Sequence, residues 1–334
     1  MDTLTHALSG ALLARASAPK DAPPRSTPRR VAAGFFAAAA PDLDFVIGFI
    51  GPVEYLLHHR GVTHSIVLLP LWALLLSWIL SKILREPRGW RALYAVTALS
   101  LGAHIAGDVI TSFGTIVFAP FSDWRAGIGT TFIIDLWFSG IILAGLAASA
   151  LLHRSRVPAV AALMLLASYV GFQAVQKGKA LEFGIQYAQS RGLSEARIEA
   201  HPRPVSALNW TVFVSTPQEH HFAHVNVMRT QPRRYRPGDG FVARLDAPYV
   251  PLAQARWETR PRYGSDLAKE AWESEALAFY RWFADHPAFD GMSEGSTCAW
   301  FVDLRFLTPG RDTTPFRYGA CRDRPGGPWR LAIS

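Results

Sequence analysis

Residues 65–84 of this 334-residue chain read SIVLLPLWALLLSWILSKIL, an apolar run in which Lys82 is the one charged residue. About 20 consecutive apolar residues are enough for a helix to cross the hydrocarbon core of a bilayer. The run therefore predicts a membrane-spanning helix over Ser65–Leu84. Pro70 lies early in the segment and is expected to bend it, because proline cannot donate a helical hydrogen bond.

Apolar segments on either side extend this prediction to a membrane domain over residues 1–176. Three more runs have the length of a span: Ala92–Gly114, Thr131–Leu152 and Pro158–Gln176. Two shorter runs rich in Ala and Gly come first, at Leu4–Ala14 and Val31–Ala40. Small residues favour close helix packing, so we expect two short tilted helices or a re-entrant pair there. The predicted fold is an α-helical membrane domain with four spans and two short N-terminal helices.

Residues 177–334 have the composition of a soluble α+β domain, rich in Arg, Trp, Phe and Pro. Strand-like composition or alternation marks three segments: Leu208–Met228, Cys298–Leu307 and Phe316–Cys321. An amphipathic pattern over Ser265–Asp285 predicts a helix. The two cysteines of the chain, Cys298 and Cys321, either pair outside the cytoplasm or remain two thiols, and the sequence leaves both possibilities open.

Lysine and arginine are distributed unequally between alternate loops of the membrane domain. Eleven lie in the loops on one side: Arg15, Lys20, Arg25, Arg29, Arg30, Lys82, Arg85, Arg88, Arg91, Arg154 and Arg156. The opposite loops hold Arg60 and Arg125. The positive-inside rule makes the first side cytoplasmic, so the last predicted span places residues 177–334 outside the cytoplasm. The net charge of +8 forms no basic stripe interleaved with aromatic residues, and no nucleic-acid partner is expected.

Histidine and aspartate gather in four places at the ends of the apolar segments in the first 110 residues. The pairs are Asp2 and His6, Asp42 and Asp44, His59 and His64, and His104 and Asp108. Ionisable residues at the margin of a membrane are costly and by default mark a functional site. The topology given by the basic loops places all eight near one membrane face, opposite the basic side. We therefore interpret them as the ligands of one metal site.

The spacing within these pairs supports shared ligation, although each pair also has a simpler explanation. Asp2 and His6, like His104 and Asp108, are four residues apart, so each pair shares one face of a helix. Taken singly, however, Asp2 could be a helix N-cap and a lone histidine a packed core residue.

The two central clusters are harder to explain without a cation. Asp42 and Asp44 could terminate a helix, but apolar residues flank them on both sides, and buried carboxylates need cations nearby. The stretch from His58 to Ser65 holds three imidazoles in seven residues, and the alternative there is an exposed polar loop.

Counting charge predicts what the site binds. Four carboxylates contribute four negative charges, which two divalent cations would neutralise. Histidine and aspartate ligands suit Zn²⁺, with Mn²⁺ and Fe²⁺ as alternatives, and paired metals commonly hydrolyse phosphoesters. Arg60 is expected to hold a phosphate oxygen, and we take Arg60 and Asp44 as the candidate catalytic residues. A further histidine group at His220, His221 and His224 is expected to be exposed polarity in a loop or strand.

Four motifs, taken in order, resemble the YdjM-like family of bacterial inner-membrane proteins, described as LexA-regulated, metal-dependent hydrolases. They are Asp2-Thr3-Leu4-Thr5-His6, Pro41-Asp42-Leu43-Asp44, His59-Arg60-Gly61-x-Thr63-His64-Ser65 and His104-x3-Asp108. The resemblance covers about residues 1–175 and implies a multi-pass inner-membrane protein with a metal site. More remotely, the last motif is similar to zinc-dependent phospholipase C and P1-type nucleases. Those enzymes use an N-terminal Trp as a ligand, which this chain lacks.

The sequence thus predicts a membrane-bound hydrolase that acts on a phosphoester or lipid-linked substrate through a metal-activated water, with the lipid bilayer as its surroundings. One alternative is a metal or proton transporter, which needs polar groups across the full membrane depth. The inner half of each predicted span is apolar, which favours a site at one face. Another alternative is a regulatory or scaffold protein whose metal is purely structural, with a closed set of ligands.

Overall fold

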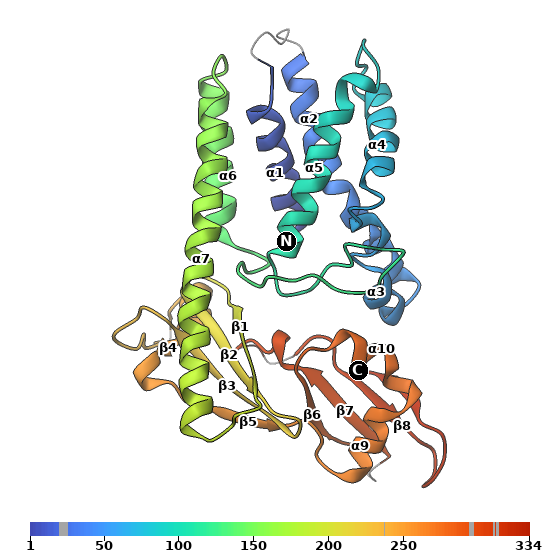
Figure 1. The fold of residues 1–334 in the computed structure, drawn as a ribbon, viewed down its shortest axis with the longest axis vertical. Coiled ribbons are helices and arrows are strands. Elements are labelled where there is room, and N and C mark those ends of the chain that lie inside the picture. The colour runs from blue at the N-terminus through green and yellow to red at the C-terminus, as the bar shows by residue number, and fades with distance from the viewer. Residues whose placement is uncertain (20–25, 237, 294–296, 310, 312–313) are drawn as a thin grey trace. The chain divides into compact units, whose positions relative to one another are not determined.

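The chain forms two compact units in the computed structural model, residues Met1–Ala174 and Val175–Ser334 (Figure 1). The structure describes residues 1–19, 26–236, 238–293, 297–309, 311 and 314–334. Two of the basic residues counted above, Lys20 and Arg25, lie outside these ranges. The first unit is helical and the second contains two β-sheets, which confirms the predicted order of a helical region followed by a sheet-containing domain.

The first unit is built from helices in the order α1 (Thr3–Ala16), α2 (Ser26–Ala39), η1 (Ala40–Phe49), α3 (Pro52–His58), η2 (Val62–His64), α4 (Leu69–Ile83), α5 (Arg91–Val109), α6 (Leu136–Leu151) and α7 (Val157–Ser190). The η elements are 3₁₀ helices. Helix α7 runs past Ala174, so its residues from Val175 onward belong to the second unit.

Among the described residues, three helical segments are long and apolar enough to cross a membrane: Ser26–Phe49, Arg91–Val109 and Val157–Ser190. A fourth candidate is the bent pair Pro52–His64 and Leu69–Ile83, whose axes differ by 81°. The described residues therefore contain up to four candidate spans, of which Arg91–Val109 and Val157–Ser190 correspond to predicted spans and the bent pair includes most of the predicted span Ser65–Leu84. Val31–Ala40 was predicted to be short, whereas the helical path continues through η1 to Phe49.

Two of the predicted spans are shorter helices because local residues start them late. Helix α4 has 15 residues, and Pro70 lies in its first turn, where the missing N–H costs nothing, so the proline starts the helix instead of bending it. Helix α6 has 16 residues because Asp135 is its N-cap. The Asp135 carboxylate accepts hydrogen bonds from the backbone N–H groups of Trp137 and Phe138, each at 3.0 Å.

Helices α1 and α2 approach so closely that their backbones touch. A Cβ atom added at Gly10 would lie 2.2 Å from the carbonyl oxygen of Gly34, and one added at Gly34 would lie 2.5 Å from that of Gly10. Helix α5 packs against both helices, with Val96 among the buried residues Ala14, Ala33, Ala37 and Leu93. The glycine crossing thus sets how the beginning of α1 lies beside the end of α2.

The second unit combines the end of α7 with two antiparallel-rich sheets. The first sheet has the order β1-β2-β3-β4, with β5 also paired to β3, and the second has the order β6-β7-β8-β9. The strands are β1 (Arg197–Pro202), β2 (Asn209–Ser215), β3 (Glu219–Asn226), β4 (Val250–Pro251), β5 (Glu258–Pro261), β6 (Pro287–Met292), β7 (Cys298–Asp303), β8 (Tyr318–Cys321) and β9 (Arg330–Ile333). Short helical elements connect them: α8 (Phe241–Asp246), η3 (Leu252–Gln254), α9 (Asp266–Glu273), η4 (Glu275–Leu277), α10 (Ala278–Phe283) and η6 (Leu304–Phe306).

Alternation along the strands gives the first sheet two buried faces. Trp210 and Val212 pack with Ala180 of α7 on one face. Phe213 and Phe222 point the other way and pack with residues of the second sheet, including Val302.

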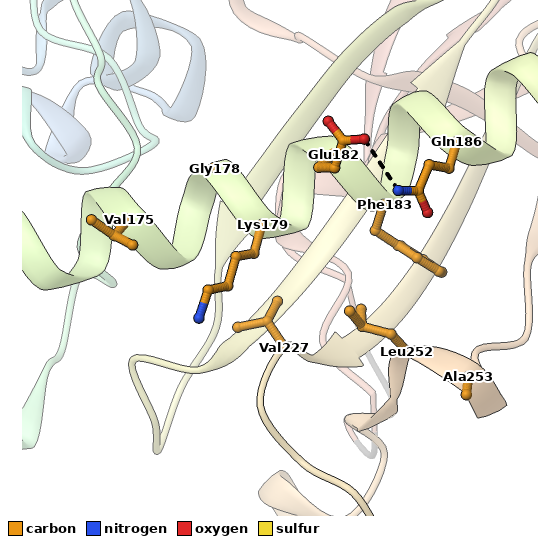
Figure 2. A pocket seen from close by; sticks show the side chains of 9 residues that line it. All are labelled: Val175, Gly178, Lys179, Glu182, Phe183, Gln186, Val227, Leu252 and Ala253. Atoms are coloured by element: carbon orange, nitrogen blue, oxygen red, sulfur yellow. Dashed lines mark hydrogen bonds between the residues drawn. The ribbon is translucent and has the colours of Figure 1, made fainter.

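A groove along α7 is lined by Lys179, Glu182, Gln186 and apolar residues such as Leu252 (Figure 2).

The predicted strands are present, with different ends. Leu208–Met228 is a hairpin of β2 and β3, Cys298–Leu307 is β7 followed by η6, and Phe316–Cys321 contains β8. The helix predicted over Ser265–Asp285 is broken at Ser274 into α9, η4 and α10. Cys298 and Cys321 are opposite residues on β7 and β8 and are joined by a disulfide.

The prediction that His220, His221 and His224 are exposed is wrong, since His220 is buried and the other two are only partly exposed. The side chain of His220 contacts Ser215 and the carbonyl oxygen of Pro287, each at 2.8 Å. The partner at Pro287 belongs to the second sheet, so the local strand pattern could not reveal this contact.

Candidate metal centre

The helices of the first unit bring the predicted metal ligands to one end of the bundle. His6 lies in the first turn of α1, Asp42 in η1 after α2, and His64 in η2 before α4. His104 and Asp108 lie near the end of α5. Figure 1 shows the N-terminus and the segment after α5 at this end, with the connections after α4 and α6 at the other. All five side chains are buried.

Four of these residues form a group that could hold a metal ion. One ligand atom each from His6, Asp42, His104 and Asp108 lies within 4.8 Å of the others. The rings of His6 and His104 are stacked with centroids 3.8 Å apart, and Nε2 of His6 is 3.0 Å from Oδ1 of Asp108. The predicted i,i+4 pair on α5 therefore points into one cluster.

His64 completes the cluster. Its Nε2 lies 2.9 Å from Nε2 of His104, 3.2 Å from Oδ2 of Asp108 and 3.7 Å from Oδ1 of Asp42. We call His6, Asp42, His64, His104 and Asp108 the membrane centre.

Hydrogen bonds on the far side of two rings determine which nitrogen faces the centre. Nδ1 of His104 is 2.6 Å from the carbonyl oxygen of Ala38. A carbonyl can only accept, so Nδ1 carries the proton and Nε2 of the neutral ring presents a lone pair. The hydroxyl of Thr63 donates to Asp44 at 2.8 Å and therefore accepts from Nδ1 of His64 at 2.9 Å. When both rings are neutral, two Nε2 lone pairs thus face each other across 2.9 Å.

The carboxylates of the centre also have oxygens without hydrogen bonds. Oδ2 of Asp42 and Oδ2 of Asp108 are buried and have no hydrogen-bond partner in the part of the chain that the structure describes. A buried acceptor left unpaired is costly, and two imidazole lone pairs aimed at each other add repulsion. A cation bound between the two carboxylate oxygens and the two imidazole nitrogens would satisfy all four atoms. The nitrogen and oxygen donors fit Zn²⁺, and the bond from His104 to a carbonyl is typical of a metal ligand.

The remaining predicted ligands lie around this cluster. Asp44 accepts hydrogen bonds from Nδ1 of His59 (2.7 Å), the backbone N–H of Arg60 (3.1 Å) and the hydroxyl of Thr63 (2.8 Å). Asp44 therefore does not face the centre directly. It holds the hydroxyl of Thr63, which in turn orients the ring of His64. His59 lies on the outer side of Asp44, with a side chain 11% exposed.

Asp2 is the N-cap of α1. Its carboxylate accepts hydrogen bonds from the backbone N–H and the hydroxyl of Thr5, at 3.0 and 2.6 Å. The sequence could not separate this role from ligation, because an Asp three residues before a Thr fits both.

Arg60 is buried beside Asp108. One guanidinium nitrogen, Nη2, lies 2.9 Å from Oδ1 of Asp108, and Nη1 donates to the hydroxyl of Thr111 at 3.2 Å. The guanidinium also lies over the ring of Phe113. The backbone of Arg60 has φ of 60°, a left-handed conformation that side chains other than glycine rarely adopt and that often marks a functional position. Sequence reasoning quoted Thr63 in a motif without giving it a role, and it did not find Thr111 or the carbonyl of Ala38, since a backbone acceptor leaves no signal in residue type.

A second group of possible ligands, missed by the sequence, lies in the second unit. Glu199, His201 and His286 each offer one atom within 4.8 Å of the others. Burial holds the pKa of His201 well below its usual value, and burial likewise lowers the pKa of the neighbouring His220 to about 4. Both rings are therefore neutral near pH 7, the form in which histidine binds metals.

Comparison with known proteins identifies the family. The model of a family described as "YdjM inner membrane protein" matches residues 1–180. The chain belongs to this family. The YdjM match includes the whole membrane centre and confirms the predicted resemblance.

A curated relative is the "Uncharacterized protein YfhP" of Bacillus subtilis (strain 168), 29% identical over 180 residues. The match covers 53% of this chain and 54% of the relative, so the chain spans about half the length of the relative that it matches. No solved structure matches the chain.

Proposed function

We propose that this YdjM-family protein is a membrane-bound, metal-dependent hydrolase whose membrane centre binds a divalent cation. The observation that carries the proposal is the convergence of two Nε2 lone pairs and two unpaired carboxylate oxygens, from His64, His104, Asp42 and Asp108, inside a helical membrane unit. A bound divalent cation supplies Lewis-acid chemistry, which polarises a phosphoryl or carbonyl oxygen and acidifies water. Three imidazoles and two carboxylates favour Zn²⁺, with Mn²⁺ and Fe²⁺ as alternatives.

The charges at the centre favour one ion. The prediction of two ions rested on four carboxylates, but Asp2 and Asp44 accept hydrogen bonds outside the group. Asp42 and Asp108 remain, and Arg60 lies against one oxygen of Asp108. These two carboxylates carry two negative charges, which one divalent cation neutralises, so we propose one ion in the membrane centre.

Arg60 is the residue that we propose contacts the substrate. Two of its guanidinium nitrogens are engaged by Asp108 and Thr111, which fixes the group in place. Its Nε is buried and has no hydrogen-bond partner among the described residues. A fixed, charged donor beside a metal suits a phosphoryl oxygen.

A lipid-linked phosphoester is the substrate class that fits the surroundings of the centre. Large apolar side chains are exposed at the same end of the helical unit. They are Leu43, Phe45, Phe49, Ile50, Phe121 and Trp124. Exposed aromatic and aliphatic residues at one end of a helical membrane domain suit the interface of a bilayer. A phosphoester held by a lipid at that level would meet the centre without leaving the membrane.

The proposed function is tested with detergent-purified protein and a panel of phosphodiesters, phosphomonoesters, lipid phosphoesters and carboxylic esters. We expect hydrolysis of a lipid phosphoester that a chelator stops and that Zn²⁺ or Mn²⁺ restores. Protein that retains its metal but hydrolyses nothing in the panel would count against a hydrolase. Metal-driven ion flux in reconstituted vesicles would then favour a transporter.

We further propose that the second unit lies outside the cytoplasm. Nine described basic residues lie in or beside the connections at the end of the helical unit opposite the membrane centre: Arg15, Arg29, Arg30, Lys82, Arg85, Arg88, Arg91, Arg154 and Arg156. The positive-inside rule makes that end cytoplasmic. Helix α7 begins there and leads into the second unit. The disulfide between Cys298 and Cys321 supports the same side, because disulfides persist in oxidising compartments.

Reporter fusions to the C-terminus test this topology. We expect a C-terminal alkaline phosphatase to be active, since the enzyme needs an oxidising compartment. A fluorescent protein that matures only in the cytoplasm should stay dark at the same position. The reverse pattern would invert the topology and place the membrane centre on the cytoplasmic side.

A further inference from the structure

We propose that the second unit contains a zinc site of its own, formed by Glu199, His201 and His286, in addition to the membrane centre. This group lies wholly within residues Val175–Ser334. It does not depend on the proposed hydrolase activity.

The fold brings the three residues together from two sheets. Glu199 and His201 are two residues apart on β1, so their side chains leave the same face of the strand. His286 directly precedes β6. Its backbone N–H donates to the buried carboxylate of Asp303 at 3.3 Å, and its ring stacks on Phe213 with centroids 4.1 Å apart. The imidazole is thus held from its backbone and from one ring face.

A chain of hydrogen bonds fixes the tautomer of His286. The carbonyl oxygen of Pro287 can only accept, so Nε2 of His220 donates to it at 2.8 Å. Nδ1 of the neutral His220 ring then accepts from the hydroxyl of Ser215 at 2.8 Å. Because the hydroxyl proton of Ser215 is already donated to His220, the Ser215 oxygen accepts a hydrogen bond from Nδ1 of His286 at 3.2 Å. Nε2 of His286 is left with a lone pair.

That lone pair points toward two other possible ligand atoms. Nε2 of His286 lies 3.2 Å from Nε2 of His201 and 2.8 Å from Oε2 of Glu199. Despite the short distance, Oε2 of Glu199 is buried and makes no hydrogen bond to any residue that the structure describes. A proton on His286 would pair that ring alone with the carboxylate, whereas a cation bound by all three atoms would satisfy both imidazoles and the carboxylate.

The donor set and its exposure indicate the kind of ion. Two imidazoles and one carboxylate are a common ligand set for Zn²⁺, and three protein ligands leave a fourth position open. The side chain of Glu199 is 28% exposed, whereas that of His286 is fully buried, so the group is reached from the Glu199 side. Arg197 binds the other carboxylate oxygen of Glu199 at 2.6 Å and orients it.

Zinc content of the full-length protein in detergent tests the site. The experiment uses the Asp108→Asn background, which is expected to empty the membrane centre. After loading with Zn²⁺ alone and removal of excess, that protein should keep about one zinc per chain. Adding His286→Gln or Glu199→Gln should reduce the content to less than about a tenth of this value. His224→Gln is the matched control, because His224 is a largely buried histidine on β3 bonded to Thr211 and outside the group. Its zinc content should not change.

Folding is checked in each variant by its melting curve. Glu199→Gln changes a partly exposed side chain and keeps the test valid if His286→Gln fails to fold. Zinc that persists at one per chain in folded Glu199→Gln protein would overturn the proposal, as would a folded Asp108→Asn protein without zinc. If zinc is lost from the membrane centre and retained at this second site, the second site is supported. The proposed hydrolase activity is then tested separately by the hydrolysis assay.

Discussion

Replacing Asp108 by Asn is expected to remove the metal from the membrane centre and to lower metal-dependent hydrolysis by about 100-fold or more. Oδ1 of Asp108 is held by Arg60 and His6, and the amino group of Met1 also contacts it. Oδ2 faces the lone pairs of His64 and His104. The amide keeps the shape of the side chain but removes the negative charge. Elemental analysis and the hydrolysis assay on purified protein measure both effects.

Asp2→Asn is the matched control for this substitution. Asn caps a helix about as well as Asp, so α1 should be unaffected and the metal content unchanged. A chelator should lower the melting temperature of the wild type and of Asp2→Asn more than that of Asp108→Asn, because a bound metal stabilises the folded state. Equal metal loss in both variants would mean that Asp2 is a ligand after all. Full metal content in Asp108→Asn would refute the membrane centre as described.

Asp303→Ala is expected to destabilise the second unit by about 3–5 kcal/mol, a large part of the stability of a typical domain. Asp303 is buried and accepts hydrogen bonds from the backbone of Asp285 and His286 and from the guanidinium of Arg305 at 2.7 Å. Removing the carboxylate breaks these hydrogen bonds and leaves the buried Arg305 guanidinium with the more exposed carboxylate of Asp285 as its ion-pair partner. Thermal unfolding followed by near-ultraviolet circular dichroism should show a clearly lower melting temperature.

Asp290→Ala provides the comparison, because Asp290 forms a part-exposed ion pair with Arg317 and should cost less than about 1 kcal/mol. The pH dependence offers a second measurement. Burial raises the pKa of Asp303, but Arg305 outweighs it and holds the pKa below its usual value. A lowered folded pKa gives stability that is present above the unfolded pKa of about 3.9 and is lost as the pH falls toward the folded value. The free energy of unfolding of the wild type should therefore fall in acid. That of Asp303→Ala should lack this contribution to its pH dependence. Equal melting temperatures for the Asp303 and Asp290 variants would contradict this account.

Where local spacing carries the information, the sequence indicated which side chains meet in the membrane centre. His104 and Asp108 are one helical turn apart, and that alone aims both at one point. The sequence could not distinguish residues that face the centre from residues that hydrogen-bond to them. Asp42 and Asp44 look equivalent in the sequence. Only the structure shows that the carboxylate of Asp44 is hydrogen-bonded to Thr63 and His59.

Contacts between distant segments explain what the sequence missed in the second unit. Glu199 and His286 are far apart in the chain and meet only because two sheets pack together. The same packing buries His220, which the strand pattern left exposed. The length of α6 was misjudged for a different reason: Asp135, inside the predicted span Thr131–Leu152, caps the helix and stops it from extending toward Thr131.

The contact of Gly10 with Gly34 has a consequence for ion selectivity. His6 lies one turn before this crossing on α1, and Asp42 lies shortly after it along the path of α2 and η1. Two backbones in direct contact have no rotamers through which their separation could relax. Donor atoms mounted on so stiff a frame distinguish ions by radius, since they cannot close around a smaller ion or open for a larger one. If the centre holds a cation as proposed, the two glycines thereby help to decide which one fits.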